Sequence, residues 1–470
     1  MAELAADDGD YDVCTEVVVV GAGAAGLVAA LAAAHRGLDV IVVERDAVPK
    51  GSTSLSAGLI PAPGTRYQRA AGISDSVELF AGDVLRKAGN EPDADTVRRL
   101  AGTIGPAIEW LDDQFDLPFS VVDNFSYPGH SALRMHGLPT RSGSELMDRL
   151  RTAAENSNIE IVTGCAAEAL ICRGRSVTGI VAKRGDGRRE KIGSGAVVLA
   201  SNGYGGNREL VRRHIPEIAD ALYFGHPGNM GDAIQWGEAL GAATRHLSGY
   251  QGHGSVAHPH GILITWATIT EGGFQVDLDG RRFFDESKGY SEAAASVAAA
   301  RDGVAWTIFD RRISAIAAQF EDFRTAEKLG AIIRSDSVED LASKARLPEG
   351  PLVATFADVD TAKRAGAIDR FGRNWANVAR LEAPYCAVKV TGALFHTQGG
   401  LVVDDKARVV DARGEPFPNL YAVGGAAAGV SGSTASGYLS GNGLLTAVGY
   451  GFIAGRSVLA ERHGGGAHRD

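Results

Sequence analysis

The clearest hydrophobic pattern in this chain is the apolar run Val17–Ala34, whose character changes halfway along it. Glu16–Val20 is rich in valine and apolar on both faces, which is typical of a strand inside a parallel sheet. Ala24–Arg36 is rich in alanine and is predicted to form a helix. Val40–Val43 is a second strand, closed by Glu44. Glycines interrupt the apolar run, so we expect a strand–turn–helix unit and no membrane span.

Later segments continue this alternation. A helix is expected at Ser142–Ala154, where a Ser-Gly-Ser-Glu start suits capping, and strands are expected at Glu160–Thr163, Val177–Lys183 and Ala196–Ala200. A loop and helix follow at Gly228–Ala242, and polar helices are expected near Thr325–Arg334 and Thr361–Ala365. The last segment, Leu420–Leu459, is expected to form a strand, a glycine loop and a helix. The last of these segments repeats the strand, glycine-rich loop and helix with which the chain begins. The pattern therefore predicts an α/β domain, 1–254 and 397–470, that is split by an inserted domain at 255–396.

Composition narrows the possible functions. The 470 residues carry a net charge of -10, and no basic stripe opposes it, so nucleic acid is not expected as a partner. The four cysteines include no CxxC pair, and no histidine group has carboxylate partners at metal-ligand spacing, so we expect no metal. The acidic N-terminus lacks the basic and apolar pattern of a secretory signal. These features favour a soluble cytoplasmic protein.

The turn between the first strand and helix carries the chain's strongest motif, Gly21-Ala22-Gly23-Ala24-Ala25-Gly26. A GxGxxG loop in this position lets the backbone turn tightly and approach a pyrophosphate, which the helix N-terminus attracts. Glu44 follows about 20 residues later, where an acid can accept hydrogen bonds from a ribose. Strand, helix, spacing and acid together predict a dinucleotide site.

Two further segments favour FAD over NAD. The loop Gly51–Gly58 is small and rich in hydroxyl groups, so it can approach a flavin closely. Near the C-terminus, the strand at Asn419–Gly425 is followed by Ser440-Gly441-Asn442-Gly443, which opens the last helix. A helix N-terminus aimed at the flavin's carbonyl edge would stabilise the negative charge of reduction. There is no second GxGxxG loop in a strand–helix context to suggest a nicotinamide site.

The chain resembles the fumarate reductase and succinate dehydrogenase flavoproteins, with their relatives the 3-ketosteroid dehydrogenases. The resemblance rests on VVVVGAGAAGLVAA at 17–30, GSTSLSAG at 51–58, ASNGYGGN at 200–207, GNMGDAIQWGEALGA at 228–242, AHPH at 257–260, DGRRFFDE at 279–286, HTQGG at 396–400 and NLYAVGG at 419–425. It implies a Rossmann-type FAD-binding domain split by an inserted α+β capping domain that closes over the flavin ring. It also implies hydride transfer between the flavin and a carbon–carbon bond next to a carbonyl or carboxylate.

The resemblance also implies a set of cofactor-binding positions. They are Gly21, Gly23, Ala24, Ala25, Gly26, Glu44, Arg45, Ser52, Thr53, Ser56, Ala57, Gly58, Ala167, Asn202, Gly203, Asp232, Gly424, Asn442, Leu444 and Leu445. Family members with covalent FAD use a histidine after the second strand, and none lies between His35 and His130, so a non-covalent flavin is expected. One departure is Gly425, which stands where the family has a glutamate.

The departures at the substrate positions are the more informative ones. Tyr290 stands where fumarate reductases have the proton-donating arginine, and Tyr438 stands where they have a substrate-binding arginine. Trp266 and Ile269 replace the glutamate and arginine of the proton relay. Arginine binds a carboxylate in a bidentate, charged manner, whereas tyrosine offers one neutral donor. Two phenols suit a neutral ketone better than a dicarboxylate.

This arrangement resembles the 3-ketosteroid dehydrogenase branch. By position, Tyr290 resembles its proton-transferring tyrosine, and Tyr438 with Ser440 resembles the pair that polarises the ketone. We therefore expect a desaturase or ene-reductase acting next to the ketone of a steroid or a smaller, apolar cyclic substrate. Its electron donor or acceptor and its physiological direction are left open.

Two alternatives remain at this stage. His258 and His396 are retained and leave room for a substrate with one carboxylate, which would make the protein an enoate reductase. A flavin-binding protein without catalysis is the alternative from another class. Tyr127 is a candidate second phenol of the site. Three further side chains, Arg134, His136 and Arg141, could touch the substrate or have surface or inter-domain roles.

Overall fold

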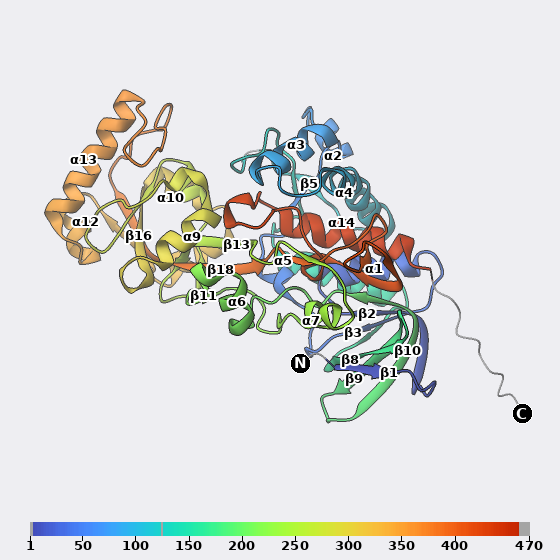
Figure 1. Cartoon of the computed structure of the whole chain (residues 1–470). Coiled ribbons are helices and arrows are strands. Elements are labelled where there is room, and N and C mark those ends of the chain that lie inside the picture. The colour runs from blue at the N-terminus through green and yellow to red at the C-terminus, as the bar shows by residue number, and fades with distance from the viewer. Residues whose placement is uncertain (1–2, 124–125, 460–470) are drawn as a thin grey trace, which may run out of the picture. The chain divides into compact units, whose positions relative to one another are not determined.

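The computed structural model of the protein describes residues 3–123 and 126–459, and it forms two compact units (Figure 1). The first unit contains residues up to Leu210, Gly225–Tyr250 and the segment from His396 onward. The second contains Val211–Phe224 and Gln251–Phe395. The first unit is thus built from three separate stretches of the sequence.

The first unit is organised around a mixed sheet, which has nine strands within the described residues. Its strands are β1 (Glu3–Ala6), β2 (Val13–Val20), β3 (Val40–Val43), β7 (Glu160–Val162), β8 (Cys165–Arg173), β9 (Ser176–Arg184), β10 (Arg189–Leu199), β20 (Arg408–Val410) and β21 (Pro416–Ala422). Parallel pairing joins β21, β10, β2, β3 and β7 in that order. In a parallel sheet, strands far apart in sequence lie side by side because each connection crosses over. Tyr421, from the C-terminal segment, is consequently in register with Val198, and Val198 with Val19.

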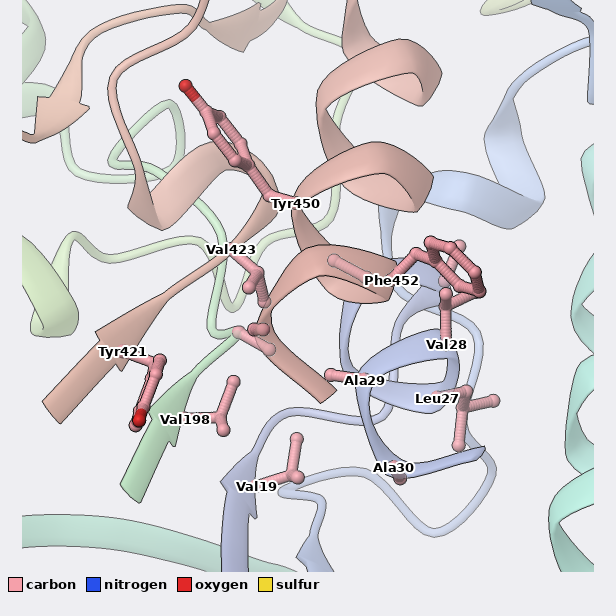
Figure 2. Close-up of a cluster of buried hydrophobic side chains, with 14 of the residues drawn as sticks. Val19, Leu27, Val28, Ala29, Ala30, Val198, Tyr421, Val423, Tyr450 and Phe452 are labelled. Carbon is pink, nitrogen blue, oxygen red and sulfur yellow. The ribbon is translucent and has the colours of Figure 1, made fainter. Parts of the chain in front are cut away.

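Helices α1 (Ala24–Ala34) and α14 (Asn442–Ser457) pack together in this unit. Figure 2 shows Val28 of α1 close to Phe452 of α14, with Val19, Val198 and Tyr421 on the neighbouring strands. The two helix axes approach closely because α14 presents glycines to α1. A Cβ on Gly451 would lie 2.6 Å from the carbonyl oxygen of Ala25, and one on Gly455 would lie 2.3 Å from that of Ala29.

Further helices and small sheets complete the first unit. They are α2 (Arg66–Ala70), α3 (Val77–Lys87), α4 (Ala94–Phe115), α5 (Gly143–Asn156), α7 (Asp232–Ala239), the sheet β4 (Ile60–Pro61), β6 (Met135–Gly137) and β5 (Ser120–Val121), and the pair β12 (Thr244–Arg245) and β19 (Gly400–Leu401). Helix α5 begins as the sequence predicts, because the Ser142 side chain accepts a hydrogen bond from the Glu145 amide. Helix α6 (Arg208–His214) crosses the boundary between the two units.

The second unit has a mixed sheet of seven strands among its described residues, with the long strand β18 near its centre. The strands are β11 (Leu222–Tyr223), β13 (Tyr250–Ala257), β14 (Ile262–Leu263), β15 (Phe274–Val276), β16 (Val304–Asp310), β17 (Ile332–Ser335) and β18 (Tyr385–Thr397). The helices are α8 (Ala267–Thr270), α9 (Tyr290–Ala298), α10 (Arg311–Ala317), α11 (Glu321–Lys328), α12 (Val338–Ala345) and α13 (Glu349–Ala365).

The structure differs from the sequence expectations at several places. The strand β8 was not expected, and the helix expected at Thr325–Arg334 ends at Lys328, because Ile332–Ser335 pairs with β18 instead. The segment Val211–Phe224 was expected in the first domain. It belongs to the second unit, since β11 pairs with β18 and Phe224 stacks on Phe395 at 4.8 Å.

No described helix of this structure has both the length and the apolar character needed to cross a membrane. Among the same residues there is also no cluster of three or more histidine, cysteine, aspartate or glutamate side chains that could hold a metal ion.

Candidate active site

The three glycines of the β2–α1 turn serve different purposes. A Cβ on Gly21, which has φ of +106°, would lie 2.7 Å from the Ala200 carbonyl oxygen, and one on Gly26 would lie 1.9 Å from the Gly21 carbonyl oxygen. These two positions need glycine because strand and helix pack against them. A Cβ on Gly23 would meet no described atom within 4 Å. Gly23 therefore leaves the backbone accessible on the side from which a pyrophosphate would approach.

Glu44 lies at the end of β3 and faces the same turn. Its carboxylate accepts hydrogen bonds from the backbone amides of Ala22 at 2.8 Å and Asp46 at 3.0 Å. The residue is 8% exposed, so it reaches the solvent only at its edge. Its position beside the glycine loop fits the ribose-binding acid that the sequence predicts, and its amide bonds hold the loop in shape.

The hydroxyl-rich loop forms the next wall of this site. Ser52 lies in the short 3-10 helix η1 (Ser52–Leu55), and its Oγ accepts hydrogen bonds from the side-chain amides of Asn202 at 3.3 Å and Asn229 at 2.8 Å. It also accepts one from the His226 amide at 3.1 Å. Thr53 Oγ1 lies 3.4 Å from the Ala24 amide at the start of α1. The structure thus brings the loop and the helix N-terminus together.

The segment after β10 is locked against the C-terminal strand. Asn202 has φ of +65°, and its Oδ1 accepts a hydrogen bond from the Gly203 amide at 2.8 Å. A Cβ on Gly425 would lie only 2.0 Å from this Oδ1, and one on Gly203 would lie 2.0 Å from Thr397 Oγ1. The absence of the family's glutamate at Gly425 therefore has a steric reason: Asn202 occupies the space that its side chain would need.

Other predicted cofactor positions have clear neighbours in the structure. Arg45 forms an ion pair with Asp232 at 2.7 Å, which ties the end of β3 to the start of α7. A Cβ on Gly424 would lie 2.9 Å from the Ala25 side chain, so β21 ends against α1. A Cβ on Gly58 would lie 2.6 Å from the Ser142 carbonyl oxygen.

The remaining positions are placed by their elements. Ser56 and Ala57 lie in the loop after η1, Leu444 and the buried Leu445 lie in the first turn of α14, and Ala167 lies in β8. The role of Ala167 in cofactor binding stays a prediction.

The N-terminus of α14 completes the candidate flavin site. The helix begins after Gly441, which has no side chain with which to cap it, and the Tyr438 phenol hydrogen-bonds to the amides of Gly441 and Gly443. Asn442 is fully buried, and its Oδ1 lacks a hydrogen-bond partner among the described residues. A buried polar atom without a partner indicates that a polar group from a ligand belongs here. Together with the accessible backbone at Gly23 and the position of Glu44, this arrangement fits FAD.

Tyr438 lies directly before this helix and is 6% exposed. Burial raises the pKa of its phenol well above the usual value, although the backbone amides of Gly443 and Gly441 hydrogen-bond to it and oppose the rise. Its ring meets that of His396 edge to face at 5.6 Å. Burial lowers the pKa of His396 to about 4, so both side chains are neutral at pH 7. Burial also raises the pKa of nearby Tyr127 to about 12.

The backbone of Ser440 is hydrogen-bonded to His130, a residue that the sequence analysis did not identify as part of the site. Its carbonyl oxygen lies 3.0 Å from His130 Nε2, while His130 Nδ1 lies 3.3 Å from the Arg134 guanidinium. Burial lowers the pKa of His130 to about 4, so the neutral ring donates from Nε2. Arg134 itself is buried between Asp75 and Asp83. Arg134, flagged as a substrate contact or surface residue, is in fact the centre of a buried ion cluster.

The other two candidate side chains, His136 and Arg141, also have structural partners. His136 is buried and hydrogen-bonds to Thr65 at 2.8 Å. The guanidinium of Arg141 lies 3.2 Å from Ser120 Oγ.

In the second unit, Tyr290 is the first residue of α9, and aromatic rings surround it. Its ring stacks on His253 at 4.8 Å with an angle of 19° between the planes, and it meets Trp266 edge to face at 6.4 Å. Trp266 and Ile269 are 3% and 1% exposed and form an apolar cluster with Ala293. The two positions that carry a proton relay in fumarate reductases are therefore part of an apolar wall beside Tyr290.

The segment DGRRFFDE at 279–286, which precedes Tyr290, explains how α9 is positioned. Glu286 is fully buried and accepts hydrogen bonds from Arg282 at 2.6 Å and from Arg373 at 3.2 Å. It also accepts one from the Gln275 amide at 3.0 Å. Arg373 continues to the Ile269 carbonyl oxygen at 3.0 Å, so a single network fixes the start of α9 and the apolar wall.

The structure separates two histidines that lie close in sequence. His258 is exposed in the turn between β13 and β14, and its catalytic role stays a prediction. His253 is the imidazole that stacks on Tyr290. Burial lowers its pKa to about 3, and its Nδ1 accepts a hydrogen bond from the Ser255 amide at 3.1 Å. The sequence did not indicate that His253 would be the histidine beside Tyr290, because which face of a strand a residue lies on becomes known only from the fold.

Comparison with known proteins identifies the family of the chain. A family model described as an FAD binding domain matches residues 16–444. The chain is 30% identical over 446 residues to a probable fumarate reductase, Ifc3, of Shewanella frigidimarina, covering 94% of this chain and 74% of that protein.

Two solved structures show the likeness in three dimensions. The open conformation of a flavocytochrome c3 fumarate reductase has a TM-score of 0.80 at 30% identity, covering 96% of this chain and 78% of the other. A 3-ketosteroid-Δ4-(5α)-dehydrogenase of Rhodococcus jostii RHA1, solved with 4-androstene-3,17-dione, has a TM-score of 0.75 at 24% identity, covering 97% and 99%. This second likeness is one of fold.

Proposed function

We propose a specific reaction from the premise that this chain belongs to the FAD binding domain family of fumarate reductase and succinate dehydrogenase flavoproteins. As a member, it is an FAD-dependent oxidoreductase that acts on CH–CH groups. The proposed reaction introduces or reduces a carbon–carbon double bond next to the ketone of a steroid or a smaller cyclic compound. Bound FAD supplies the hydride acceptor or donor.

The observation that carries this proposal is the apolar wall around Tyr290. A dicarboxylate needs cationic partners, because an unpaired charge loses several kcal/mol of hydration on burial. Here Trp266, Ile269 and Ala293 form the wall, and the stacked His253 is neutral. Such surroundings favour an uncharged substrate.

Tyr290 is the proposed proton-transfer group. In the direction of desaturation, the deprotonated phenol oxygen of Tyr290 takes the proton from the carbon next to the ketone, and the bound FAD would accept the hydride from the neighbouring carbon. In the direction of reduction, Tyr290 returns the proton to the same carbon. Its position at the N-terminus of α9 helps, since the helix dipole stabilises negative charge on the oxygen.

Tyr438 is proposed to hold the ketone oxygen. Burial keeps its phenol protonated, and a protonated phenol can donate a hydrogen bond. A donor that strengthens its bond as the ketone becomes an enolate lowers the barrier to removing the adjacent proton. Ser440, whose carbonyl His130 holds in place, is proposed to assist Tyr438.

One alternative has support of its own. His396 lies beside Tyr438, and the relative of 30% identity is named a probable fumarate reductase. A reductase of unsaturated monocarboxylates could use His396 as a donor to the carboxylate. The neutral state of both side chains makes this substrate the weaker candidate.

Replacement of Tyr290 by phenylalanine tests the proposal. The Tyr290→Phe variant is expected to keep its FAD and lose at least about 100-fold in turnover of a cyclic ketone, the usual range for a proton-transfer group. Tyr385→Phe in the same unit is the matched control and is expected to keep full activity. Turnover is followed in both directions, with an artificial electron acceptor for desaturation and a reduced dye for reduction.

The substrate panel contains 3-ketosteroids, substituted cyclohexanones, enoates and fumarate. Full turnover of every ketone by Tyr290→Phe would show that the tyrosine does not transfer the proton. Rapid turnover of fumarate by the wild type would contradict the argument from Tyr290 and Tyr438, and preference for a monocarboxylate would favour the alternative.

A further inference from the structure

Gln398 connects His396 with the first turn of α14 through a chain of hydrogen bonds. Asn442 Nδ2 donates to Ser431 Oγ at 2.9 Å, and Ser431 Oγ donates to Gln398 Oε1 at 2.7 Å. Gln398 Nε2 lies 2.8 Å from His396 Nδ1. The Asn442, Ser431 and Gln398 side chains are 0%, 1% and 4% exposed, so bulk water does not compete for these bonds.

The donor and acceptor roles along these hydrogen bonds determine which ring nitrogen of His396 carries the proton. A serine hydroxyl has one proton, and Ser431 gives it to Gln398 Oε1. The remaining end of the Gln398 amide is its NH₂ group, which can only donate. His396 Nδ1 must therefore accept, and a neutral imidazole then has its proton on Nε2.

One other neighbour of His396 Nδ1 would require the opposite arrangement. The Thr397 carbonyl oxygen lies 3.4 Å from Nδ1 and could bind only an Nδ1–H group. The Gln398 contact of 2.8 Å is the shorter of the two and has the length of a strong hydrogen bond. The titratable side chain that faces the ring is Tyr438, which burial keeps neutral.

The protonated nitrogen faces the start of α14. A Cβ on Gly443 would lie 2.8 Å from His396 Nε2 and 3.7 Å from the Tyr438 phenol oxygen, so the two polar atoms flank the same glycine. In the Nε2–H form, His396 and Tyr438 are both donors there. In the other form, His396 would present a lone pair and repel a carbonyl oxygen.

We propose that Gln398 is a positioning residue that holds His396 in its Nε2–H tautomer, so that His396 donates a hydrogen bond to the substrate's carbonyl oxygen. His396 in this state is a donor and takes no proton from the substrate. The identity of the acceptor as a ketone rests on the proposed function, whereas the tautomer rests on the hydrogen bonds alone.

Nitrogen-15 NMR of the FAD-loaded enzyme tests the tautomer, since protonated and unprotonated ring nitrogens have well-separated shifts. The His396 signals are assigned by their loss in His396→Gln. Gln398→Glu replaces the amide with a carboxylate that can only accept, and Gln398→Met removes the hydrogen bond while keeping the length of the side chain. Gln319→Glu, an exposed position in the second unit, controls for the added charge.

In the wild type, Nε2 is expected to be protonated and Nδ1 unprotonated. In Gln398→Glu, Nδ1 becomes protonated, and kcat/KM on a cyclic ketone falls by on the order of 100-fold, with kcat affected more than KM. In Gln398→Met the two tautomers mix, and Gln319→Glu matches the wild type. A merely structural role for Gln398 would leave the tautomer unchanged.

Two results would overturn the positioning role: a protonated Nδ1 in the wild type, or an unaltered ring in Gln398→Glu. A third result separates the two proposals. If the wild type has the Nε2–H tautomer but turns over no ketone, the proposed substrate is wrong and the tautomer assignment stands.

Discussion

Replacing Arg134 with methionine probes the buried ion cluster behind Ser440. Arg134 and both of its partners, Asp75 and Asp83, have side chains that are 0% exposed. Its guanidinium bonds to both oxygens of Asp75, at 2.9 and 3.0 Å, and lies over the Phe80 ring at 4.7 Å. Methionine keeps the length and the apolar contact but leaves Asp75 without its cation and leaves Asp83 with only the exposed Arg86.

The expected loss of stability follows from that geometry. Breaking a buried ion pair by removing one partner costs about 3–5 kcal/mol, because the remaining charge stays buried and uncompensated. The first unit has about 300 residues, for which the unfolding entropy near the midpoint is about 0.6 kcal/mol per kelvin. Arg134→Met should therefore lower the unfolding midpoint of this unit by about 5–8 °C.

The effect should also depend on pH. Burial raises the pKa of Asp83, but hydrogen bonds from Ser131 and Arg134 outweigh burial, so its pKa lies below the usual value in the folded wild type. That depressed pKa contributes stability above the unfolded value of about 4, and this contribution is lost as the pH falls through the folded pKa. Without Arg134, the pKa of Asp83 rises because part of the opposition to burial is lost, while Ser131 and Arg86 remain, and protonation then relieves part of the penalty. The difference from the wild type should thus be largest near pH 7.5 and smaller at pH 5.

Scanning calorimetry at both pH values measures this difference. Arg98→Met is the matched control, since Arg98 pairs with Asp95 on the surface, where the two side chains are 56% and 81% exposed. Such a pair contributes at most about 1 kcal/mol. Adding Asp83→Asn to Arg134→Met should restore part of the midpoint. The reasoning would be refuted if Arg134→Met and Arg98→Met had the same midpoint, or if the loss were equal at both pH values.

Two further predictions concern glycines of the site. Gly443→Ala places a Cβ 2.8 Å from His396 Nε2, so kcat/KM in a steady-state assay should fall about 10- to 100-fold while FAD is retained. Gly449→Ala is the control, because its Cβ would lie 2.8 Å from the flexible end of the Leu100 side chain, and this variant should retain activity in the same assay. Gly425→Glu, which installs the family residue, should weaken FAD binding about 10-fold or more because its Cβ would lie 2.0 Å from Asn202 Oδ1. A fluorescence titration with FAD measures this, and adding Asn202→Gly should recover affinity; unchanged binding by the single variant would contradict the steric account.

Local patterns in the sequence were sufficient for the cofactor half of the site. The strand, the glycine turn and the helix at Ala24 are where the periodicity predicts them, and Glu44 closes β3 beside the turn. These features are set by interactions between residues close in sequence. FAD and the family followed from the same motifs, and both are confirmed.

The sequence was less informative where distant segments meet. Gln398 stands in the HTQGG motif beside His396, yet its partner Ser431 lies 33 residues away, and no local pattern indicates that contact. Arg134 is charged and was placed near substrate or surface, whereas the fold buries it between two aspartates. A charge is buried only where the fold supplies its partners, which a single segment cannot reveal.

The sequence by itself thus determined the FAD cofactor, and it predicted the glycine turn as part of the cofactor's site and phenols in place of arginines at the substrate positions. Only the tertiary structure decided the surroundings of those phenols. It placed the neutral His253 and the apolar wall beside Tyr290, and it placed helix amides and His396 beside Tyr438. The physical reason is that the sequence gives the type of each residue directly. The protonation state of a phenol and the tautomer of a histidine depend instead on burial and on neighbours that only the fold brings together.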